Sequence, residues 1–361
     1  MPSHFPMPLT IEEITPEWLT QALRTRAPEA RVESVEVVDV MHSTTTKVRL
    51  RLGLDAVGRR AGLPEVVILK GGFEPHSRNV EMTNMHEKEV RGYRDVFPAM
   101  PLPTPACYFA DYDRERRQGI IIMEDLVGRG VTFCHASRPQ TPDQVARRLT
   151  ALARFHAKSW GSAEVRPGGR WAYLDDFLES MQPFFDHNIA PQTWGRFCAA
   201  PRGAAVSVRF HDRAWMADAH ARMVRFSQTL PHCVLHGDTH LGNLYVDPDG
   251  TPGFFDTLAS RGPGMMEVTY HVSAALDAAD RRDAERPLVQ HYLDELARHG
   301  VEPPPIEEAM RQYGVLLLYG YFIWMTTESH YQTESVNTAN AARVSAAMLD
   351  HDTIGLIREL P

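Results

Sequence analysis

A short polar segment near residue 240 constrains the fold of this chain more than any other feature. It reads His236-Gly237-Asp238-Thr239-His240-Leu241-Gly242-Asn243. Asp256 follows thirteen residues after its last residue. The apolar pair 234–235 predicts a short buried strand before the segment, and residues 244–246 and 253–255, which flank a turn at 247–250, predict a hairpin after it. We expect this hairpin to begin beside Asn243 and to end at Asp256, which would bring the two side chains together.

The order of polar groups in this segment suits phosphoryl transfer to a hydroxyl. Such a transfer needs little covalent chemistry from the protein, but it requires a positioned acceptor and divalent metal held against the phosphates. Asp238 can accept the proton of the acceptor hydroxyl. The side-chain oxygens of Asn243 and Asp256 are of the kind that Mg²⁺ binds. We therefore predict that Asp238 is the catalytic residue, as the base or as the group that orients the acceptor, and that Asn243 and Asp256 are metal ligands.

The HGDxHxxN pattern and the strand-borne Asp256 resemble the aminoglycoside phosphotransferase and choline kinase family. The resemblance implies an α+β, bilobal protein-kinase-like fold with a small β-rich N-terminal lobe and a larger, mainly helical C-terminal lobe. It also implies ATP as phosphate donor, Mg²⁺ as cofactor and a small-molecule hydroxyl acceptor. The segments EDL at 124–126 and LAxxHAxxW at 152–160 are most similar to the choline-kinase-like, ecdysteroid-kinase-like branch.

The predicted elements follow the order that two such lobes require. The patterns predict strands at 32–40, 47–54, 64–70 and 120–123 and helices at 11–26, 82–97 and 143–160. After residue 125 helices should predominate, apart from the hairpin. We predict an N-terminal nucleotide-binding lobe at 1–125 and a C-terminal lobe with the catalytic loop and acceptor pocket at 126–361.

The resemblance assigns a lysine and a glutamate to the nucleotide site. Lys70 ends a predicted strand, where the family places the lysine that contacts the α- and β-phosphates; a lysine that simply leaves a strand for solvent is the alternative. The sequence EVRGY that begins at Glu89 looks like the family's E-V-x-x-Y helix. Glu89 is therefore the expected partner of Lys70, and Glu87 is the alternative.

Two further segments are expected to contact the nucleotide. Ser43, Thr44 and Thr45 occupy the position of the phosphate-covering loop. The stretch has no glycine, but hydroxyl and backbone N–H groups can also cradle an anion. Glu124 and Leu126 lie in a segment that resembles the interlobe hinge, whose backbone groups can pair with adenine. The preference for ATP over GTP follows from the family and not from the chemistry of these residues.

The chain departs from its relatives at two positions near the site. Relatives carry an aspartate that stabilises the catalytic loop in a G-x-P-x-x-D segment, and here the residue is Glu267, one methylene longer. Thr257 follows Asp256, where relatives usually have an aromatic residue or glutamate. Neither change removes a catalytic ligand, but both change the expected local geometry. His156, in the LAxxHAxxW helix, is expected to be a core histidine.

A zinc site is a competing interpretation of the central segment. His232, His236 and His240 recur at intervals of four residues. That spacing brings ligands together only on a helix, and the β-forming pair 234–235, with Gly237 and glycine at 242, disfavours one. We prefer a structural role for His236 in the loop and a role for His240 in orienting Asp238 or lining the site.

Two hypotheses other than a kinase, and several acceptors, stay open at this point. The first is a nucleotide-binding, pseudokinase-like scaffold without transfer activity, and the second is a hydrolase, for which the chain lacks a nucleophile motif. In relatives the C-terminal helices shape the acceptor pocket. The candidates there are Tyr319, Tyr321, Trp324, Glu328, Asn340 and Arg343, with a place in the core as the favoured alternative for the aromatic residues.

Composition limits the remaining possibilities. The chain has 361 residues, 43% of them hydrophobic, which is typical of a globular protein with a large core. Its net charge of −8 argues against nucleic acid as the main partner. Four scattered cysteines without a CxxC pair, and no evident signal peptide, predict a cytoplasmic protein. The apolar run at 315–325 is too short for a membrane span and predicts a buried helix. The oligomeric state is left open.

Overall fold

The computed structural model describes residues 5–42, 45–78 and 80–361, and these divide into two compact units. The first unit comprises Met1–Val131 and Phe255–Leu258, and the second comprises Thr132–Phe254 and Ala259–Pro361. The division after Val131 lies six residues beyond the predicted lobe boundary at 125. The segment Phe255–Leu258 joins the first unit because Asp256 forms ion pairs with Lys47 and Lys70 of that unit.

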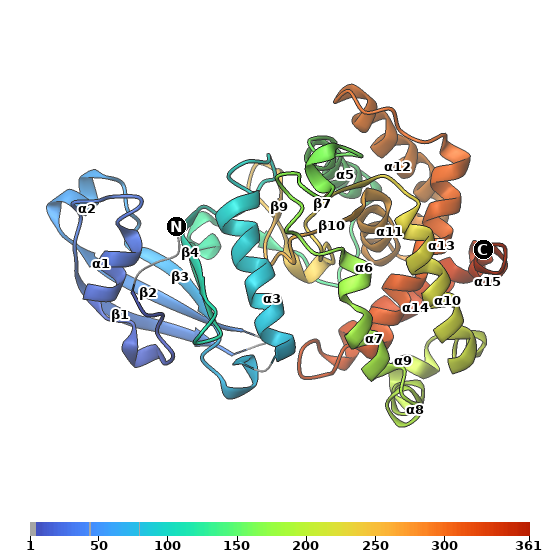
Figure 1. The fold of residues 1–361 in the computed structure, drawn as a ribbon, viewed down its shortest axis with the longest axis horizontal. Coiled ribbons are helices and arrows are strands. Elements are labelled where there is room, and N and C mark those ends of the chain that lie inside the picture. The colour runs from blue at the N-terminus through green and yellow to red at the C-terminus, as the bar shows by residue number, and fades with distance from the viewer. Residues whose placement is uncertain (1–4, 43–44, 79) are drawn as a thin grey trace. The chain divides into compact units, whose positions relative to one another are not determined.

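Within the described residues, the first unit is built on a five-stranded antiparallel sheet (Figure 1). The strands are β1 (Val32–Met41), β2 (Thr46–Leu54), β3 (Val66–Gly71), β4 (Cys107–Asp113) and β5 (Gln118–Glu124), in the order β1-β2-β3-β5-β4. Burial along β2 alternates with a period of two, so one of its faces packs on the core. The apolar run of β5 is buried throughout because both of its faces are covered: Ile120 and Ile122 belong to one apolar cluster, and Ile121 and Met123 belong to another.

The four predicted strands of this unit are confirmed, whereas β4 was not predicted. Its sequence, CYFADYD, contains aspartates, which are depleted in strands. An edge position, as the order of the sheet shows for β4, tolerates such residues because one side of the strand is unpaired. Propensity alone therefore missed a strand that the neighbouring β5 stabilises.

Helices pack on this sheet, and a proline alters the first of them. The helical segments are η1 (Ile11–Glu13), α1 (Pro16–Leu23), α2 (Ala56–Arg60), η2 (Pro75–Arg78), α3 (Val80–Arg91), η3 (Gly92–Val96) and α4 (Leu126–Arg129). The single helix predicted at 11–26 is wrong. Pro16 cannot continue a helix from the preceding turn, and Thr15 before it is extended and caps α1 by accepting a hydrogen bond from Trp18.

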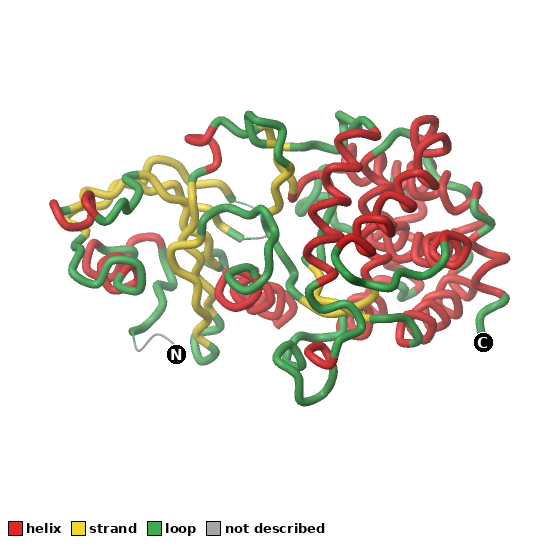
Figure 2. The backbone as a smooth tube through the Cα atoms, turned by 90° about the horizontal axis from the view of Figure 1, so that it is seen from above, coloured by secondary structure: helices red, strands yellow, loops and turns green. Residues whose placement is uncertain are grey.

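The second unit is mainly helical, as predicted, and helices (red) make up most of it in Figure 2. Its long helices are α5 (Pro142–Ala157), α10 (Arg213–Gln228), α11 (Gly264–Ala275), α12 (Ala278–Arg298), α13 (Ile306–Thr326) and α14 (Glu334–Asp350). Shorter ones are η4 (Ala163–Val165), α6 (Phe177–Ser180), α7 (Gln182–Asn188), α8 (Pro191–Ala199), α9 (Pro201–Ala204), η5 (Val208–Phe210), η6 (Leu241–Asn243) and α15 (Thr353–Arg358).

Helix α13 forms the centre of this unit. It contacts α10, α11, α12, α14 and α15, and its apolar segment at 315–325 is buried on nearly all sides, as the sequence predicted. A helix that is apolar all round needs such neighbours on every face. In the described ranges, no helix combines the length and the apolar character that crossing a membrane requires.

Short strands connect these helices and include the predicted hairpin. They are β6 (Thr132–Phe133), β7 (His232–Leu235), β8 (Leu244–Val246), β9 (Pro252–Phe254) and β10 (Ser260–Pro263). Strands β8 and β9 pair antiparallel, and Gly250 closes their turn with a φ of 86°. Helix α5 begins at a capping box formed by Thr141 and Gln144.

A buried arginine attaches this hairpin to α5. The guanidinium of Arg148 donates hydrogen bonds to the carbonyls of Gly253 (2.7 Å) and Tyr245 (3.1 Å) and lies 5.1 Å from the ring centre of Phe254. Burial lowers the pKa of Arg148 to about 10, which still leaves it charged at neutral pH. The strand register pairs Tyr245 with Gly253, and the tyrosine ring covers the glycine.

Replacing Gly253 with alanine should therefore destabilise the helical unit by about 1–3 kcal/mol, because the new methyl group would overlap the buried ring of Tyr245. Urea unfolding followed by tryptophan fluorescence measures this, since five of the six tryptophans lie in that unit. Gly195→Ala is the matched control. A methyl group there meets no atom within 4 Å on the exposed side of α8, so it should stabilise by about 0.4–1 kcal/mol. Equal losses in both variants would contradict this account.

Candidate active site

The predicted catalytic segment forms a loop between β7 and η6. Strand β7 pairs with β10, and the loop begins after Leu235. The three histidines at four-residue spacing therefore do not lie on a helix, as expected. Gly237 adopts a φ of 90°, a backbone conformation that residues other than glycine rarely adopt. The glycine that precedes Asp238 is thus required by the backbone.

The buried carboxylate of Glu267 fixes the backbone of this loop. It accepts hydrogen bonds from the N–H groups of Gly237 and His236 (3.2 Å) and contacts His156 Nε2 at 2.8 Å. The other ring nitrogen of His156 bonds to the hydroxyl of Tyr292 at 2.8 Å. His156 is therefore the core histidine that was predicted, and the longer side chain at 267 still reaches the loop.

Hydrogen bonds keep this carboxylate ionised although it is buried. Burial alone raises the pKa of Glu267, but the hydrogen bond and charge of His156, the charge of His236 and the Gly237 amide outweigh it. The pKa therefore lies below its usual value. A carboxylate that accepts several backbone N–H bonds is stable in its charged form.

Asp238 is held by two neighbours from its own loop. The amide nitrogen of Asn243 donates to Asp238 Oδ2 at 2.8 Å and to its main-chain oxygen at 3.1 Å. Nδ1 of His240 accepts the Gly242 N–H at 2.9 Å, which leaves the proton on Nε2, 3.6 Å from Asp238 Oδ2. With its nitrogen turned to Asp238, Asn243 directs its amide oxygen away from that carboxylate.

Aromatic rings of the helical unit surround His240. Its ring packs edge-to-face on Trp324 at 5.2 Å, Trp324 stacks on Tyr270 at 6.0 Å, and Tyr270 contacts Tyr319 at 5.2 Å. Burial, and next the charge of Asp238, raise the pKa values of Tyr270 and Tyr319 well above the usual value. All three rings are buried, which agrees with the favoured core interpretation of Tyr319 and Trp324.

The remaining acceptor candidates lie elsewhere in the helical unit. Tyr321 packs on Phe210, and Glu328 forms an ion pair with the guanidinium of Arg196. Asn340 is buried. Arg343 donates hydrogen bonds to two main-chain carbonyls, at residues 274 and 136. The sequence did not single out Tyr270, which lies on α11 and could be found only once the packing of α11 against α13 was known.

The predicted lysine and glutamate meet within the sheet-bearing unit. Lys70 is buried at the end of β3, and its Nζ lies 2.7 Å from Glu89 Oε1 of α3 and 2.8 Å from Asp256 Oδ1. Glu87 instead contacts Arg91 and an arginine at 114. Glu89 is thus the glutamate that lies against Lys70, and the solvent-exposed alternative for Lys70 is wrong.

Lys47 is a residue of this cluster that the sequence analysis missed. Its Nζ lies 3.1 Å from Asp256 Oδ2, and the register of β2 on β3 pairs it directly with Lys70. The charges of Lys47 and Lys70 hold the pKa of Asp256 well below its usual range, although burial opposes this. Asp256 itself has a left-handed φ of 53°, which aspartate tolerates better than most residues.

The structure describes three of the five other residues that are predicted to contact the nucleotide. Ser43 and Thr44 lie outside the described residues, and Thr45 is buried just before β2. The Glu124 N–H donates to the carbonyl of residue 106 at 2.9 Å, and the Glu124 carboxylate pairs with an arginine at 129. Leu126 begins α4, so the expected extended hinge turns into a short helix at this point.

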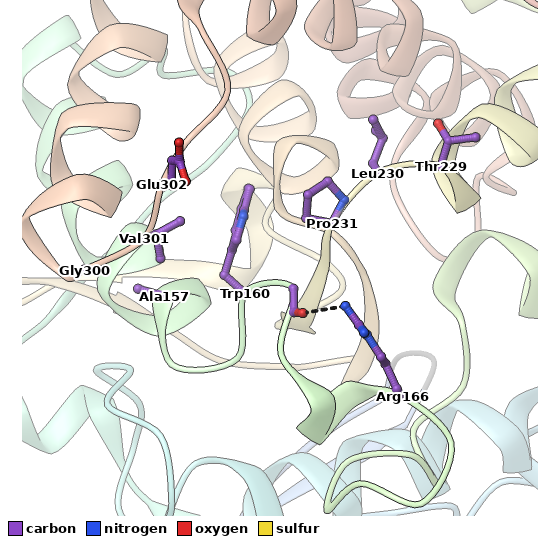
Figure 3. Close-up of a pocket in the computed structure, with 10 residues that line it drawn as sticks. Ala157, Trp160, Arg166, Thr229, Leu230, Pro231, Gly300, Val301 and Glu302 are labelled. Carbon is purple, nitrogen blue, oxygen red and sulfur yellow. Dashed lines mark hydrogen bonds between the residues drawn. The ribbon is translucent and has the colours of Figure 1, made fainter.

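A cavity of about 600 Å³ lies at the opposite end of β7 from the catalytic loop. Figure 3 shows Trp160 between Val301 and Pro231, the residue that precedes β7, with Glu302 nearby. The Arg166 guanidinium at its edge donates a hydrogen bond to a main-chain carbonyl at residue 161. Neither Asp238 nor Asn243 lines this cavity.

Comparison with solved structures identifies the class of fold. The chain resembles a candidate aminoglycoside phosphotransferase from Ralstonia eutropha JMP134 (14% identity over 96% of this chain and 98% of that one, TM-score 0.55). It also resembles a choline kinase from Cryptosporidium parvum Iowa II (9%, 94% and 95%, TM-score 0.55) and an ethanolamine kinase from Plasmodium vivax (10%, 86% and 82%, TM-score 0.51). At such identities the likeness establishes a protein-kinase-like fold and nothing finer.

A family model defines the chain more closely. Residues 39–301 match the ecdysteroid kinase-like family, and the protein belongs to that family. No curated protein matches the sequence significantly. The matched range contains Lys70, Glu89, Asp238, Asn243 and Asp256.

Replacing Glu267 with glutamine should lower the free energy of unfolding by about 2 kcal/mol or more at pH 7, because the amide leaves buried N–H donors poorly paired. The depressed pKa of Glu267 adds stability above the unfolded-state value of 4.5, which is lost as the pH falls toward the folded-state value. Urea unfolding at pH 7 and pH 4 should thus show a smaller difference between variant and wild type in acid. The exposed Glu302→Gln is the control and should show neither effect.

Proposed function

We propose that this protein transfers the γ-phosphate of Mg·ATP to a hydroxyl of a small-molecule acceptor, in the cytoplasm. The observation that carries the proposal is the loop at Asp238. A glycine with positive φ precedes this carboxylate, Asn243 donates to it, and a buried glutamate holds the loop backbone. Membership of the ecdysteroid kinase-like family supports the same class of reaction.

Asp238 is the proposed base or orienting group for the acceptor hydroxyl. The hydrogen bond from Asn243 and the nearby His240 Nε2 restrict its carboxylate to one orientation before any substrate arrives. Positioning of this kind lowers the barrier because less freedom is lost at the moment of transfer. His240 is the proposed positioning residue, since the Gly242 N–H selects its tautomer.

The donor nucleotide is assigned to residues of the sheet-bearing unit. Lys70 is proposed to contact the donor phosphates, and Glu89 to position Lys70. Ser43, Thr44 and Thr45 are proposed to cover the phosphates, and the segment with Glu124 and Leu126 to contact the base.

Asn243 and Asp256 are the proposed magnesium ligands, and the residues fit this ion. An amide oxygen and an ionised carboxylate are the hard oxygen donors that Mg²⁺ prefers. The lowered pKa of Asp256 keeps its carboxylate charged throughout the neutral range. When bound, the ion would neutralise charge on the donor's phosphate oxygens.

The test is transfer of labelled γ-phosphate from Mg·ATP into a pooled library of small alcohols. Asp238→Asn should reduce labelled product by about 100-fold or more, while nucleotide affinity stays the same, because the amide cannot accept the proton. The exposed Asp218→Asn on α10 is the control and should retain wild-type transfer. Equal transfer by Asp238→Asn and wild type would show that Asp238 is not the base. Nucleotide binding with no product from any alcohol would favour the pseudokinase-like scaffold.

Replacing His240 with leucine should lower kcat by about 10- to 100-fold with little change in the KM for nucleotide, because only the orientation of Asp238 is disturbed. Glutamine at this position should restore most of kcat, since its amide can both accept the Gly242 N–H and donate to Asp238. Steady-state kinetics of the two variants measures this. A loss of the same size in both would argue against a positioning role.

A further inference from the structure

The carboxylate of Asp256 is already shared by two ammonium groups. Its Oδ1 lies 2.8 Å from Lys70 Nζ, and its Oδ2 lies 3.1 Å from Lys47 Nζ. Mg²⁺ binds carboxylate oxygens at about 2.0–2.1 Å. If Asp256 is a magnesium ligand, as proposed above, the ion and the two ammonium groups compete for the two oxygens of this carboxylate.

The two lysines differ in how firmly they are held. The Lys70 side chain is 6% exposed, and Glu89 is its second partner at 2.7 Å. The Lys47 side chain is 27% exposed, and among the described residues Asp256 is the only carboxylate within 4 Å of its ammonium group. Moving Lys47 therefore breaks one contact at the edge of the cluster, whereas moving Lys70 would also disturb its buried ion pair with Glu89.

The register of the sheet determines where Lys47 can go. Lys47 of β2 and Lys70 of β3 are directly paired in an antiparallel ladder, so both side chains point to the same face of the sheet. Neighbouring strands lie about 4.8 Å apart. Two ammonium groups at this spacing can contact successive phosphates of one polyphosphate chain.

We propose that Lys47 is a second phosphate-binding lysine that exchanges partners: it pairs with Asp256 in the free protein and moves to the donor phosphates when the magnesium nucleotide binds. The inference rests on the proposed function. In this exchange the incoming metal takes the place of one ammonium group at Asp256, and the released ammonium group pairs with the negatively charged phosphates. While the nucleotide is absent, Lys47 supplies a second cation for the carboxylates of Asp256 and Glu89, which both contact Lys70.

This exchange predicts two effects of opposite sign for Lys47→Met. Without the competing ammonium group, the free protein should bind Mn²⁺, a probe of the divalent-metal site, about 3- to 10-fold more tightly, because a like charge no longer occupies Asp256. Without the phosphate contact, the variant should bind the magnesium complex of a non-hydrolysable ATP analogue about 10-fold more weakly. Lys47→Arg should keep the affinity for the nucleotide complex near that of wild type.

Electron paramagnetic resonance measures Mn²⁺ binding to the free protein, and titration calorimetry measures the affinity for the nucleotide complex. Arg51→Met is the matched control, since Arg51 lies on the same strand and pairs with Glu36 instead. Thermal unfolding without ligand identifies folded variants, and Lys47→Gln replaces the methionine variant if the latter does not fold. Asp256→Ala should abolish the increase in Mn²⁺ affinity that Lys47→Met produces.

The two binding measurements separate this inference from the proposed function. If the wild type binds no magnesium nucleotide, the proposed function fails. If the wild type binds it and Lys47→Met binds it equally well, the phosphate-binding role of Lys47 is wrong. Unchanged or weaker Mn²⁺ affinity in Lys47→Met would overturn the exchange at Asp256.

Discussion

The carboxylate of Glu267 connects the loop that carries Asp238 to the core of the helical unit. On one side it accepts the N–H groups of His236 and Gly237, and on the other it contacts a buried histidine, His156. The left-handed backbone at Gly237 and the orientation of Asp238 both depend on this anchor. A loop that carries polar groups into a protein interior needs partners for its backbone, and one ionised side chain supplies two of them here.

In the sheet-bearing unit, ion pairs between side chains hold the candidate site residues in place, as Glu267 holds the loop in the helical unit. Lys47, Lys70, Glu89 and Asp256 form a cluster in which positive and negative groups are equal in number. A buried ion cluster contributes little to stability in comparison with apolar packing, because desolvation opposes the attraction. It does place charged groups of both signs at defined positions on one face of a sheet.

Each sequence prediction succeeded or failed for a physical reason that depends on which residues stabilise the element. The β8–β9 hairpin was predicted because its turn residues and β-formers act over a few positions. The helix predicted at 11–26 failed at a local signal, Pro16, that periodicity outweighed. Strand β4 was missed because the stabilising neighbour, β5, is a separate segment. Propensity describes single segments, whereas strand pairing depends on two.

The sequence by itself determined the family, the α+β fold and the candidates Lys70, Asp238 and Asp256, because these depend on residue types at short spacing. Tertiary structure decided which groups touch. The packing of α3 turned Glu89, and not Glu87, toward Lys70, and the register of β2 on β3 added Lys47 to the cluster. A helix rotated by one residue or a strand shifted by one position would change every such contact. Rotation and register are set by packing across the whole unit, which local sequence does not encode.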